Sequence, residues 1–322
     1  MSALPSTGRP VFEPTERVPA LAALRSAVTD RRWDAVAAAF EALPDEDDRV
    51  QACRTVAETP GAETFLRQVA DQRPGDPLPR TLLAQRLVQA GWDVRTAARA
   101  EHVSRRQFDA FFAHLRQAEQ LLIDVCAEYP AYGLAWYVRI ITGRGLELGQ
   151  SETRRRHDRL AEHHPHHYSG QLQLLQQLCP KWGGTWEAAD AFVRDAVAKA
   201  PEGNPNGALV AVLQMEHYLE LTEKESKQAA ERHLRDPGRH ARLVDAARRS
   251  VLHPAFRPDS HQAVGAHSAF AAAHSVAGRP ADAAPHFRAL GDHASEFPWG
   301  YVGNGDHEAA FVRHRKTALA KG

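Results

Sequence analysis

Cysteine is scarce in this sequence, since only Cys53, Cys126 and Cys179 occur among 322 residues. An odd number of widely separated cysteines does not suit a disulfide framework, and none of them has the CxxC spacing of a metal or redox motif. We therefore expect three reduced thiols, buried as small apolar groups, in a protein of the cytoplasm.

An excess of charge is also missing, because 40 Lys and Arg residues balance 40 Asp and Glu residues. Proteins that bind nucleic acid usually carry a basic domain or stripe, so nucleic acid is not an expected partner. No apolar run reaches the roughly 20 residues that cross a bilayer, and the first residues lack the pattern of a secretory signal. Neither a membrane span nor export is predicted.

The sequence motifs of common nucleotide-binding and hydrolase enzymes are absent too. The chain has no GxxxxGK[ST] phosphate loop, no GxSxG nucleophile elbow and no GxGxxG after a strand. No predicted helix carries an ExxH pair of the kind that builds di-iron sites. We therefore predict no catalytic residue, no metal and no cofactor.

Apolar residues recur at intervals of three and four through nearly the whole chain, which is the period of one helix face. Residues 33–43 and 105–128 are clear examples, and Pro130 stops the second of these helices. No segment has the pattern of a convincing strand. The sequence therefore predicts an all-α protein.

Pairs of predicted helices recur at roughly 35 to 50 residues, which indicates an α-solenoid of antiparallel helix hairpins. Residues 277–291, AGRPADAAPHFRALG, are the part most similar to a tetratricopeptide repeat. Small side chains at Ala277, Ala281 and Ala284 allow two helices to approach closely, and Phe287 fills the groove between them. We predict a tetratricopeptide-like array.

The array is predicted to begin after an N-terminal group of helical hairpins. We place these hairpins in residues 1–74 and the array in residues 75–322. Residues 222–240 are more polar and contain a Pro-Gly pair, so we expect an exposed turn or a flexible joint there. Residues 296–306, EFPWGYVGNGD, are expected to be a Gly-rich connector.

The sequence PKWGGT, residues 180–185, joins two helical segments. Pro180 has no backbone N–H to continue the preceding helix. Gly183 or Gly184 can take a positive φ, and Thr185 is a good N-cap for the next helix. We interpret this corner as structural, clamped by the nearby tryptophans, and keep a ligand-binding corner as the alternative.

Residues 178–192, LCPKWGGTWEAADAF, resemble the Pro-(Lys/Arg)-Trp-Gly-Gly-(Ser/Thr) corner of bacterial tetratricopeptide-like proteins of unknown function. Residues 118–140 and 297–311 fit the same resemblance, which covers residues 75–315. The resemblance implies an all-α fold and a role in protein interaction, and it implies no reaction. The aromatic candidates for binding a partner are Trp182, Trp186, Trp299 and Tyr301.

Histidine is abundant, and four of the 18 histidines, His163, His164, His166 and His167, lie in the sequence EHHPHHY. Imidazole is a common ligand of Zn, Cu and Ni, but Pro165 interrupts the spacing that HExxH zinc hydrolases place on one helix. We expect His164 near an N-cap and Pro165 at the first helical position, in a solvated turn. These four histidines remain candidates for binding, and a metal- or His-dependent enzyme site near this turn is the alternative.

Two further patterns carry weaker signals. His267 and His274 lie seven residues apart on one helix face, which we interpret as a partly exposed polar face. Residues 96–108 have the spacing of a helix-turn-helix, in which Arg105 and Arg106 would contact phosphates. The second helix of that motif is strongly apolar, however, so DNA binding is not favoured.

These patterns together favour a cytoplasmic helical-repeat scaffold or regulator that binds a protein or peptide on a concave face. An immunity-type protein that inhibits one partner is an alternative within the same class. The oligomeric state is not predicted from the sequence.

Overall fold

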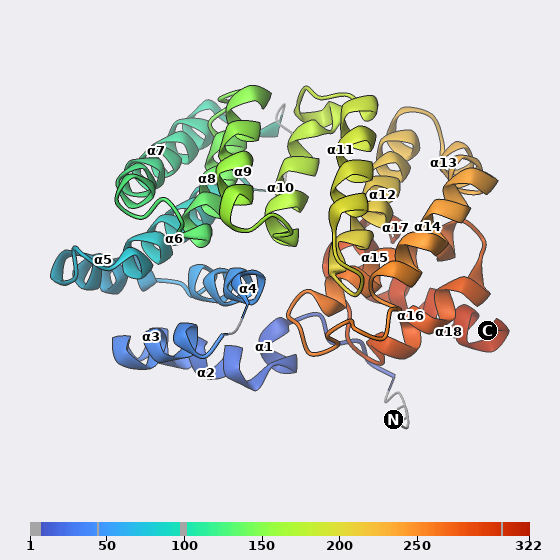
Figure 1. Cartoon of the computed structure of the whole chain (residues 1–322), viewed down its shortest axis with the longest axis horizontal. Coiled ribbons are helices and arrows are strands. Elements are labelled where there is room, and N and C mark those ends of the chain that lie inside the picture. The colour runs from blue at the N-terminus through green and yellow to red at the C-terminus, as the bar shows by residue number, and fades with distance from the viewer. Residues whose placement is uncertain (1–7, 44, 97–101, 304) are drawn as a thin grey trace. The chain divides into compact units, whose positions relative to one another are not determined.

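The structure, a computed structural model, describes residues 8–43, 45–96, 102–303 and 305–322. These residues form eighteen α-helices and no β-strand, and one isolated backbone bridge joins Val11 to His293 (Figure 1). The prediction of an all-α protein is therefore confirmed.

The chain divides into two compact units. One comprises Val18–Gly184, and we call it the 18–184 unit. The other combines Met1–Arg17 with Thr185–Gly322, and we call it the split unit. The proposed division into residues 1–74 and 75–322 stays a prediction.

The 18–184 unit contains nine α-helices and a short 3-10 helix. They are α2 (Pro19–Thr29), α3 (Trp33–Glu41), α4 (Glu46–Ala57), α5 (Ala62–Gln72), α6 (Pro77–Arg95), α7 (Arg105–Glu128), α8 (Gly133–Gly145), α9 (Gln150–His163), α10 (Tyr168–Leu178) and η2 (Pro180–Trp182). Local signals set several of these boundaries. The Asp76 carboxylate caps α6, where Pro77 is the first residue, and Ser104 forms a capping box with Gln107 at the start of α7.

The core of this unit is formed by apolar residues of neighbouring helices. Leu82 and Leu83 of α6, Leu115 and Leu122 of α7 and Leu134 of α8 are almost completely buried. Helices α6 and α7 pack along one another, and α7 also contacts α8 (Figure 1). Burial of about 1.5 to 3 kcal/mol per large apolar side chain is the main force that holds these helices together.

The split unit contains the other nine α-helices and a second 3-10 helix. They are α1 (Pro14–Arg17), α11 (Trp186–Lys199), η3 (Pro205–Gly207), α12 (Ala208–Lys224), α13 (Lys227–Leu234), α14 (Pro237–Arg249), α15 (Ala263–Val276), α16 (Pro280–Leu290), α17 (Glu296–Val302) and α18 (His307–Lys321). Helices α15, α16 and α18 form its centre, where Phe270, Phe287 and Phe311 are buried.

Residues near the N-terminus belong to the split unit because they pair with its C-terminal part. The Val11 amide donates to the Asp292 carbonyl at 2.7 Å, and the Ala294 amide donates to the Val11 carbonyl at 3.0 Å. The Arg315 guanidinium donates to the Gly8 carbonyl at 3.1 Å. The unit is thus assembled from two separate stretches of sequence.

Two segments are more helical than expected. Residues 222–240 contain the end of α12, all of α13 and the start of α14, and Ser226 and Asp236 cap the last two helices through their side chains. Residues 296–306 include α17 rather than only a connector. Its Trp299 is completely buried and packs near Phe287 and Phe311.

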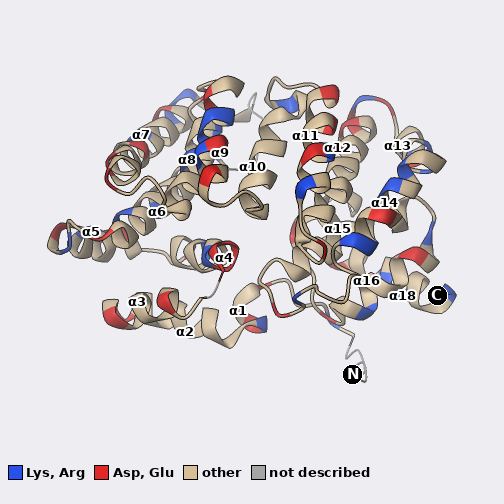
Figure 2. Ribbon diagram, viewed as in Figure 1, with Lys and Arg blue, Asp and Glu red and all other residues tan. Residues whose placement is uncertain are grey.

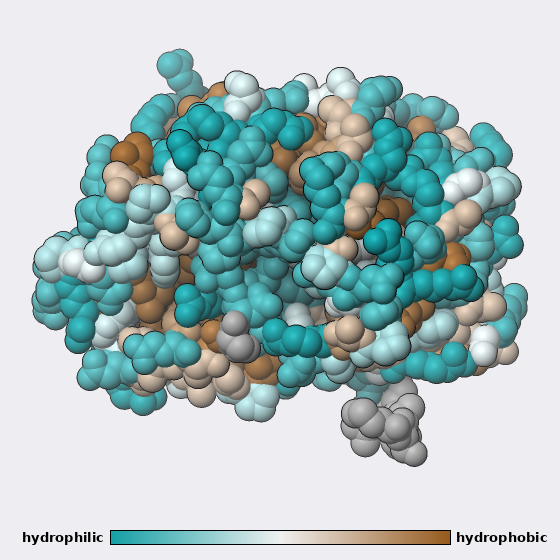
Figure 3. Space-filling model, viewed as in Figure 1, coloured by the Kyte–Doolittle hydropathy of each residue, from teal (hydrophilic) through white to brown (hydrophobic). Residues whose placement is uncertain are grey.

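Residues of both charge signs are interspersed along the helices of both units (Figure 2). The face visible in Figure 3 is mainly hydrophilic, and its hydrophobic residues lie in separate patches. Within the described ranges, no helix is long and apolar enough to cross a membrane. The three cysteines are free and buried, as predicted.

Candidate functional site

The corner at residues 180–185 has the local structure that its sequence predicts. Helix α10 ends at Leu178, and Gly183 adopts a φ of 81°. The Thr185 hydroxyl accepts a hydrogen bond of 3.2 Å from the Ala188 amide and so caps α11. Gly184 has a separate requirement, because a Cβ atom there would collide with the Leu178 carbonyl group.

Two glutamine side chains fix the backbone of this corner. Gln150 of α9 donates to the Gly183 carbonyl, and Gln177 of α10 donates to the Trp182 carbonyl at 3.0 Å. The other end of the Gln177 amide accepts from the Thr153 hydroxyl at 3.3 Å. The corner is therefore tied to α9 and α10, which limits the movement of Trp182.

An open groove of about 760 Å³ lies beside the corner, wholly within the 18–184 unit. Its volume is in the range of sites that bind small ligands or a few peptide residues. Its lining comprises Trp92, Arg95, Phe108, Phe111, Arg144, Gly145, Glu147, Gly149, Gln176, Gln177, Lys181, Trp182 and Gly183. Among the described residues of the lining, four are aromatic and three are cationic, whereas one, Glu147, is acidic.

The two arginines of the groove are paired with aromatic rings of its lining. The Arg144 guanidinium carbon lies 5.4 Å from the Trp182 ring centre, and the group donates to the Gln173 side chain at 2.8 Å. The Arg95 guanidinium lies 5.4 Å from the Trp92 ring and 5.7 Å from the Phe108 ring. Such cation–π contacts orient the arginines while they remain part of the groove surface.

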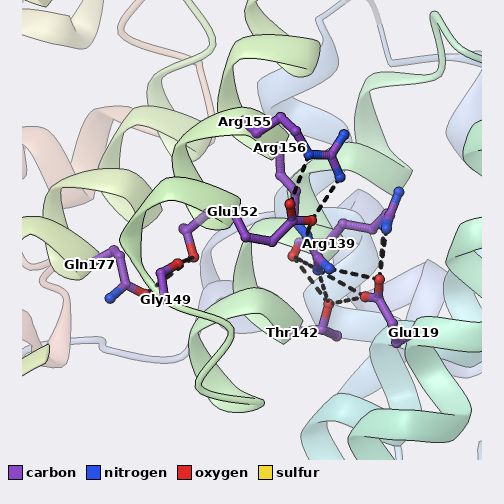
Figure 4. Close-up of polar contacts among 9 residues, drawn as sticks. Glu119, Arg139, Thr142, Gly149, Glu152, Arg155, Arg156 and Gln177 are labelled. Carbon is purple, nitrogen blue, oxygen red and sulfur yellow. Dashed lines mark hydrogen bonds and ion pairs between the residues drawn. The ribbon is translucent and has the colours of Figure 1, made fainter.

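A buried network of charges lies in α7, α8 and α9 of the same unit (Figure 4). The Glu119 carboxylate accepts hydrogen bonds from Arg139 at 2.7 Å, from Thr142 at 2.6 Å and from Arg156 at 2.9 Å. Arg156 also donates to Glu152 at 2.7 Å. The network joins three helices, and Arg144 and Glu147 of the groove follow Thr142 closely in the sequence.

Glu152 is the outer carboxylate of this network. Hydrogen bonds from Arg155, and then from Arg156, lower the pKa of Glu152 to about 2. Glu152 is therefore ionised at neutral pH, and its negative charge pairs with the positive charges of Arg155 and Arg156. Because every charge has an opposite partner, we interpret the network as structural support rather than as acid–base machinery.

The His-rich turn has a different cap from the one predicted. Helix α9 ends at His163 and α10 begins at Tyr168, so His164 is a C-cap and Pro165 is not at a first helical position. His167 is the N-cap, and its Nδ1 atom accepts from the Gly170 amide at 3.0 Å. The His167 imidazole thus supplies an acceptor for one of the amides that have no partner within the helix, and this favours a helix start at Tyr168.

Asp47 of α4 completes this helix start. Its two carboxylate oxygens accept hydrogen bonds of 2.8 Å from the amides of Tyr168 and Ser169. His167 is buried, His164 and His166 are half-buried, and His163 is exposed. These contacts give His167 a structural role, and among the described residues no group of three possible metal ligands lies at the turn.

The aromatic candidates are divided between the two units. Trp182 belongs to the 18–184 unit and is half-buried, so it is not the core residue that a clamp requires. Trp186 belongs to the split unit, where its indole donates to Glu220 at 2.5 Å and its ring lies 3.6 Å from that of His217. Burial and the neighbouring His233 lower the pKa of His217 to about 4.

Trp299 and Tyr301 also lie in the split unit. Trp299 is fully buried, which leaves no surface of its side chain for a partner. Tyr301 is half-buried, and its hydroxyl lies 3.4 Å from the Glu216 carboxylate. Of the aromatic residues predicted from the sequence, Trp182 lines the groove described above.

The split unit contains a buried histidine cluster that the sequence pattern does not reveal. His267 and His274 of α15 are 5% and 1% exposed, so the predicted partly exposed face is wrong. His286 of α16 is completely buried, and its Nδ1 atom lies 3.1 Å from Nδ1 of His267. Burial lowers the pKa of His267 and that of His274 to about 4, so both rings are neutral at pH 7.

The segment with helix-turn-helix spacing is only partly described, because residues 97–101 lie outside the described residues. Arg105 and Arg106 are exposed at the start of α7. The same helix buries Phe111 and Leu115 in the core of the 18–184 unit. This burial agrees with the apolar character that argues against a recognition helix.

Comparison of the chain with known protein families, with curated proteins and with solved structures gives no match.

Proposed function

We propose that the chain is a non-catalytic helical-repeat scaffold or regulator that binds a protein or peptide. A solenoid arrangement is supported by the order of contacts in the 18–184 unit. Helix α2 contacts α4, α4 contacts α6, α6 contacts α8, and α8 contacts α10. The inner helices of stacked hairpins contact one another in such a series, and it favours the tetratricopeptide-like arrangement.

The groove beside Trp182 carries the proposal of a binding site. Among the described residues of its lining, three cationic residues outnumber one acidic residue, and four aromatic rings line the same surface. Aromatic and arginine side chains dominate the binding energy of protein interfaces because they combine large contact area with hydrogen bonding. An acidic peptide segment that carries an apolar or aromatic side chain matches this lining in charge and in polarity.

A peptide fits this groove better than a nucleic acid does. Single-stranded nucleic acid is bound by stacking rings together with a continuous basic path. The chain has no excess of Lys and Arg over Asp and Glu, and the cationic residues in the described part of the lining are Arg95, Arg144 and Lys181. The cytoplasm is the proposed location, which the three free thiols support.

Fluorescence anisotropy with short labelled peptides tests the proposal. The panel contains acidic peptides with one Trp or Leu, the same peptides with Lys in place of each Glu, and a labelled oligothymidylate. We expect the acidic apolar peptides to bind and Trp182→Ala to weaken them at least tenfold. Preference for the oligothymidylate, or equal binding by acidic and basic peptides, would contradict the proposal.

The matched control is Trp186→Ala, which removes the neighbouring tryptophan of the sequence motif. Trp186 does not line the groove and belongs to the other unit. Peptide affinity is therefore expected to stay unchanged in this variant. An equal loss in both variants would indicate that the whole motif, rather than the groove, is responsible for binding.

A further inference from the structure

Three helices of the split unit bring two imidazoles and a carboxylate together. His240 comes from α14, His274 from α15 and Asp282 from α16, and each offers one ligand atom within 4.8 Å of the others. His240 Nε2 lies 2.9 Å from a carboxylate oxygen of Asp282. In the part of the chain that the structure describes, this is the one group with such geometry.

The innermost residue of the group is His274. Its side chain is 1% exposed, and its Nδ1 atom has no hydrogen-bond partner among the described residues. A buried polar atom without a hydrogen-bond partner typically costs about 1 to 3 kcal/mol of folding stability. The presence of such an atom in the core therefore needs an explanation. A neutral imidazole nitrogen is also the form that binds a metal ion.

The two outer residues connect this group to solvent. The side chains of His240 and Asp282 are 23% and 41% exposed. An ion can therefore reach the group from water, and the Asp282 carboxylate supplies a negative charge for it. A site closed by four protein ligands would be structural, whereas three protein ligands leave a position for water or a small anion.

We propose that His240, His274 and Asp282 bind one divalent transition-metal ion. Two imidazoles and one carboxylate are a donor set for Zn²⁺, and also for Fe²⁺. Zn²⁺ is the first choice because it has no preferred geometry of its own and accepts the ligand positions that the helices fix. The site lies in the split unit, so it is separate from the peptide groove and independent of the proposed function.

Neighbouring aromatic residues hold His274 in place. The His286 ring is nearly parallel to the His274 ring at a centre-to-centre distance of 5.7 Å, and it also stacks on Phe270 at 5.0 Å. His286 in turn contacts His267 through their Nδ1 atoms. These residues are positioning residues, because they orient a ligand without being one themselves.

Titration with Co²⁺ tests the site, since tetrahedral Co²⁺ has visible absorption bands and stands in for Zn²⁺. The full chain is first treated with a chelator and then titrated. We expect one equivalent of Co²⁺ per chain, displacement by Zn²⁺, and a rise in melting temperature on addition of Zn²⁺. Asp282→Asn and His240→Gln are each expected to weaken binding at least tenfold.

Both substitutions are at partly exposed positions and preserve side-chain size, so the metal-free variants should melt close to the metal-free wild type. The matched control is the double variant His163→Ala, His166→Ala, which removes two histidines of the His-rich turn and should bind Co²⁺ as the wild type does. Undiminished binding by Asp282→Asn would overturn the proposal. The proposal would also be overturned if the wild type bound no Co²⁺. It would be overturned as well if the double variant His163→Ala, His166→Ala lost Co²⁺ binding.

Discussion

Glu119 and Arg156, which are 37 residues apart in the sequence, are joined by two hydrogen bonds of 2.9 Å each. The pair is bidentate, and it is buried together with Arg139. Paired guanidinium and carboxylate groups are strongly directional, so this contact fixes the position of α9 relative to α7.

Glu119→Gln should destabilise the 18–184 unit by about 3 to 5 kcal/mol, because it leaves two buried guanidinium groups without their common anion. Hydrogen exchange of α8 peptides at increasing urea concentration measures this loss locally. The control is Glu162→Gln, since Glu162 and Arg159 form an exposed pair and should contribute less than about 1 kcal/mol. Equal effects of the two substitutions would argue against a stabilising network.

Glu152 should make the stability of the 18–184 unit depend on pH in the acid range. Its pKa is about 2 in the folded chain and about 4.3 in an unfolded chain. The unfolded state therefore binds more protons between these values, so the contribution is present above the unfolded pKa and is lost as the pH falls toward 2. In Glu152→Gln this dependence should be weaker. Urea midpoints measured from pH 7 downward check it, and parallel curves for the two proteins would refute it.

Trp136 and Trp182 should respond differently to replacement by alanine. Trp136 is 6% exposed and its indole donates to the Pro130 carbonyl at 2.8 Å, so Trp136→Ala should cost about 3 to 5 kcal/mol of stability. Trp182 is half-buried and lines the groove. Trp182→Ala should therefore lower stability much less than Trp136→Ala while it weakens peptide binding. Thermal and urea unfolding of both variants compare them, and equal losses would place Trp182 in the core after all.

Gly184→Ala should destabilise the corner by about 1 to 3 kcal/mol, because its new methyl group meets the Leu178 carbonyl and forces a backbone shift. Gly75→Ala is the control, since a Cβ atom there has no neighbour within 4 Å. The urea midpoints of the two variants provide the measurement. If Gly184→Ala had the same urea midpoint as the wild type, the backbone of the corner would be able to shift and accommodate the methyl group without loss of stability.

Local signals in the sequence predicted the secondary structure well. The helix at residues 105–128 has the predicted bounds, and Thr185 is the cap that its hydroxyl and position indicated. Both depend on interactions within one or two turns of helix, which a sequence pattern records directly. The same holds for Pro180 as the end of a helix.

Tertiary packing decided the features that the sequence did not reveal. The Pro and Gly residues around Trp299 indicated a connector, but burial of the indole near Phe287 and Phe311 favours the short helix α17. The spacing of His267 and His274 correctly indicates that they share one helix face. Their burial, however, depends on α16, which packs against α15. His240 joins His274 and Asp282 from a third helix, and no local sequence pattern indicates this contact.

The pairing of Val11 with Asp292 and Ala294 also bears on the order in which the chain is made. A ribosome releases residues 18–184 long before it reaches the partners of residues 8–17. The 18–184 unit has all its helices at that stage and can fold during synthesis. Residues 8–17 are thus made before the 18–184 unit and find their place after it, because completion of the split unit waits until residues 292–315 have been made.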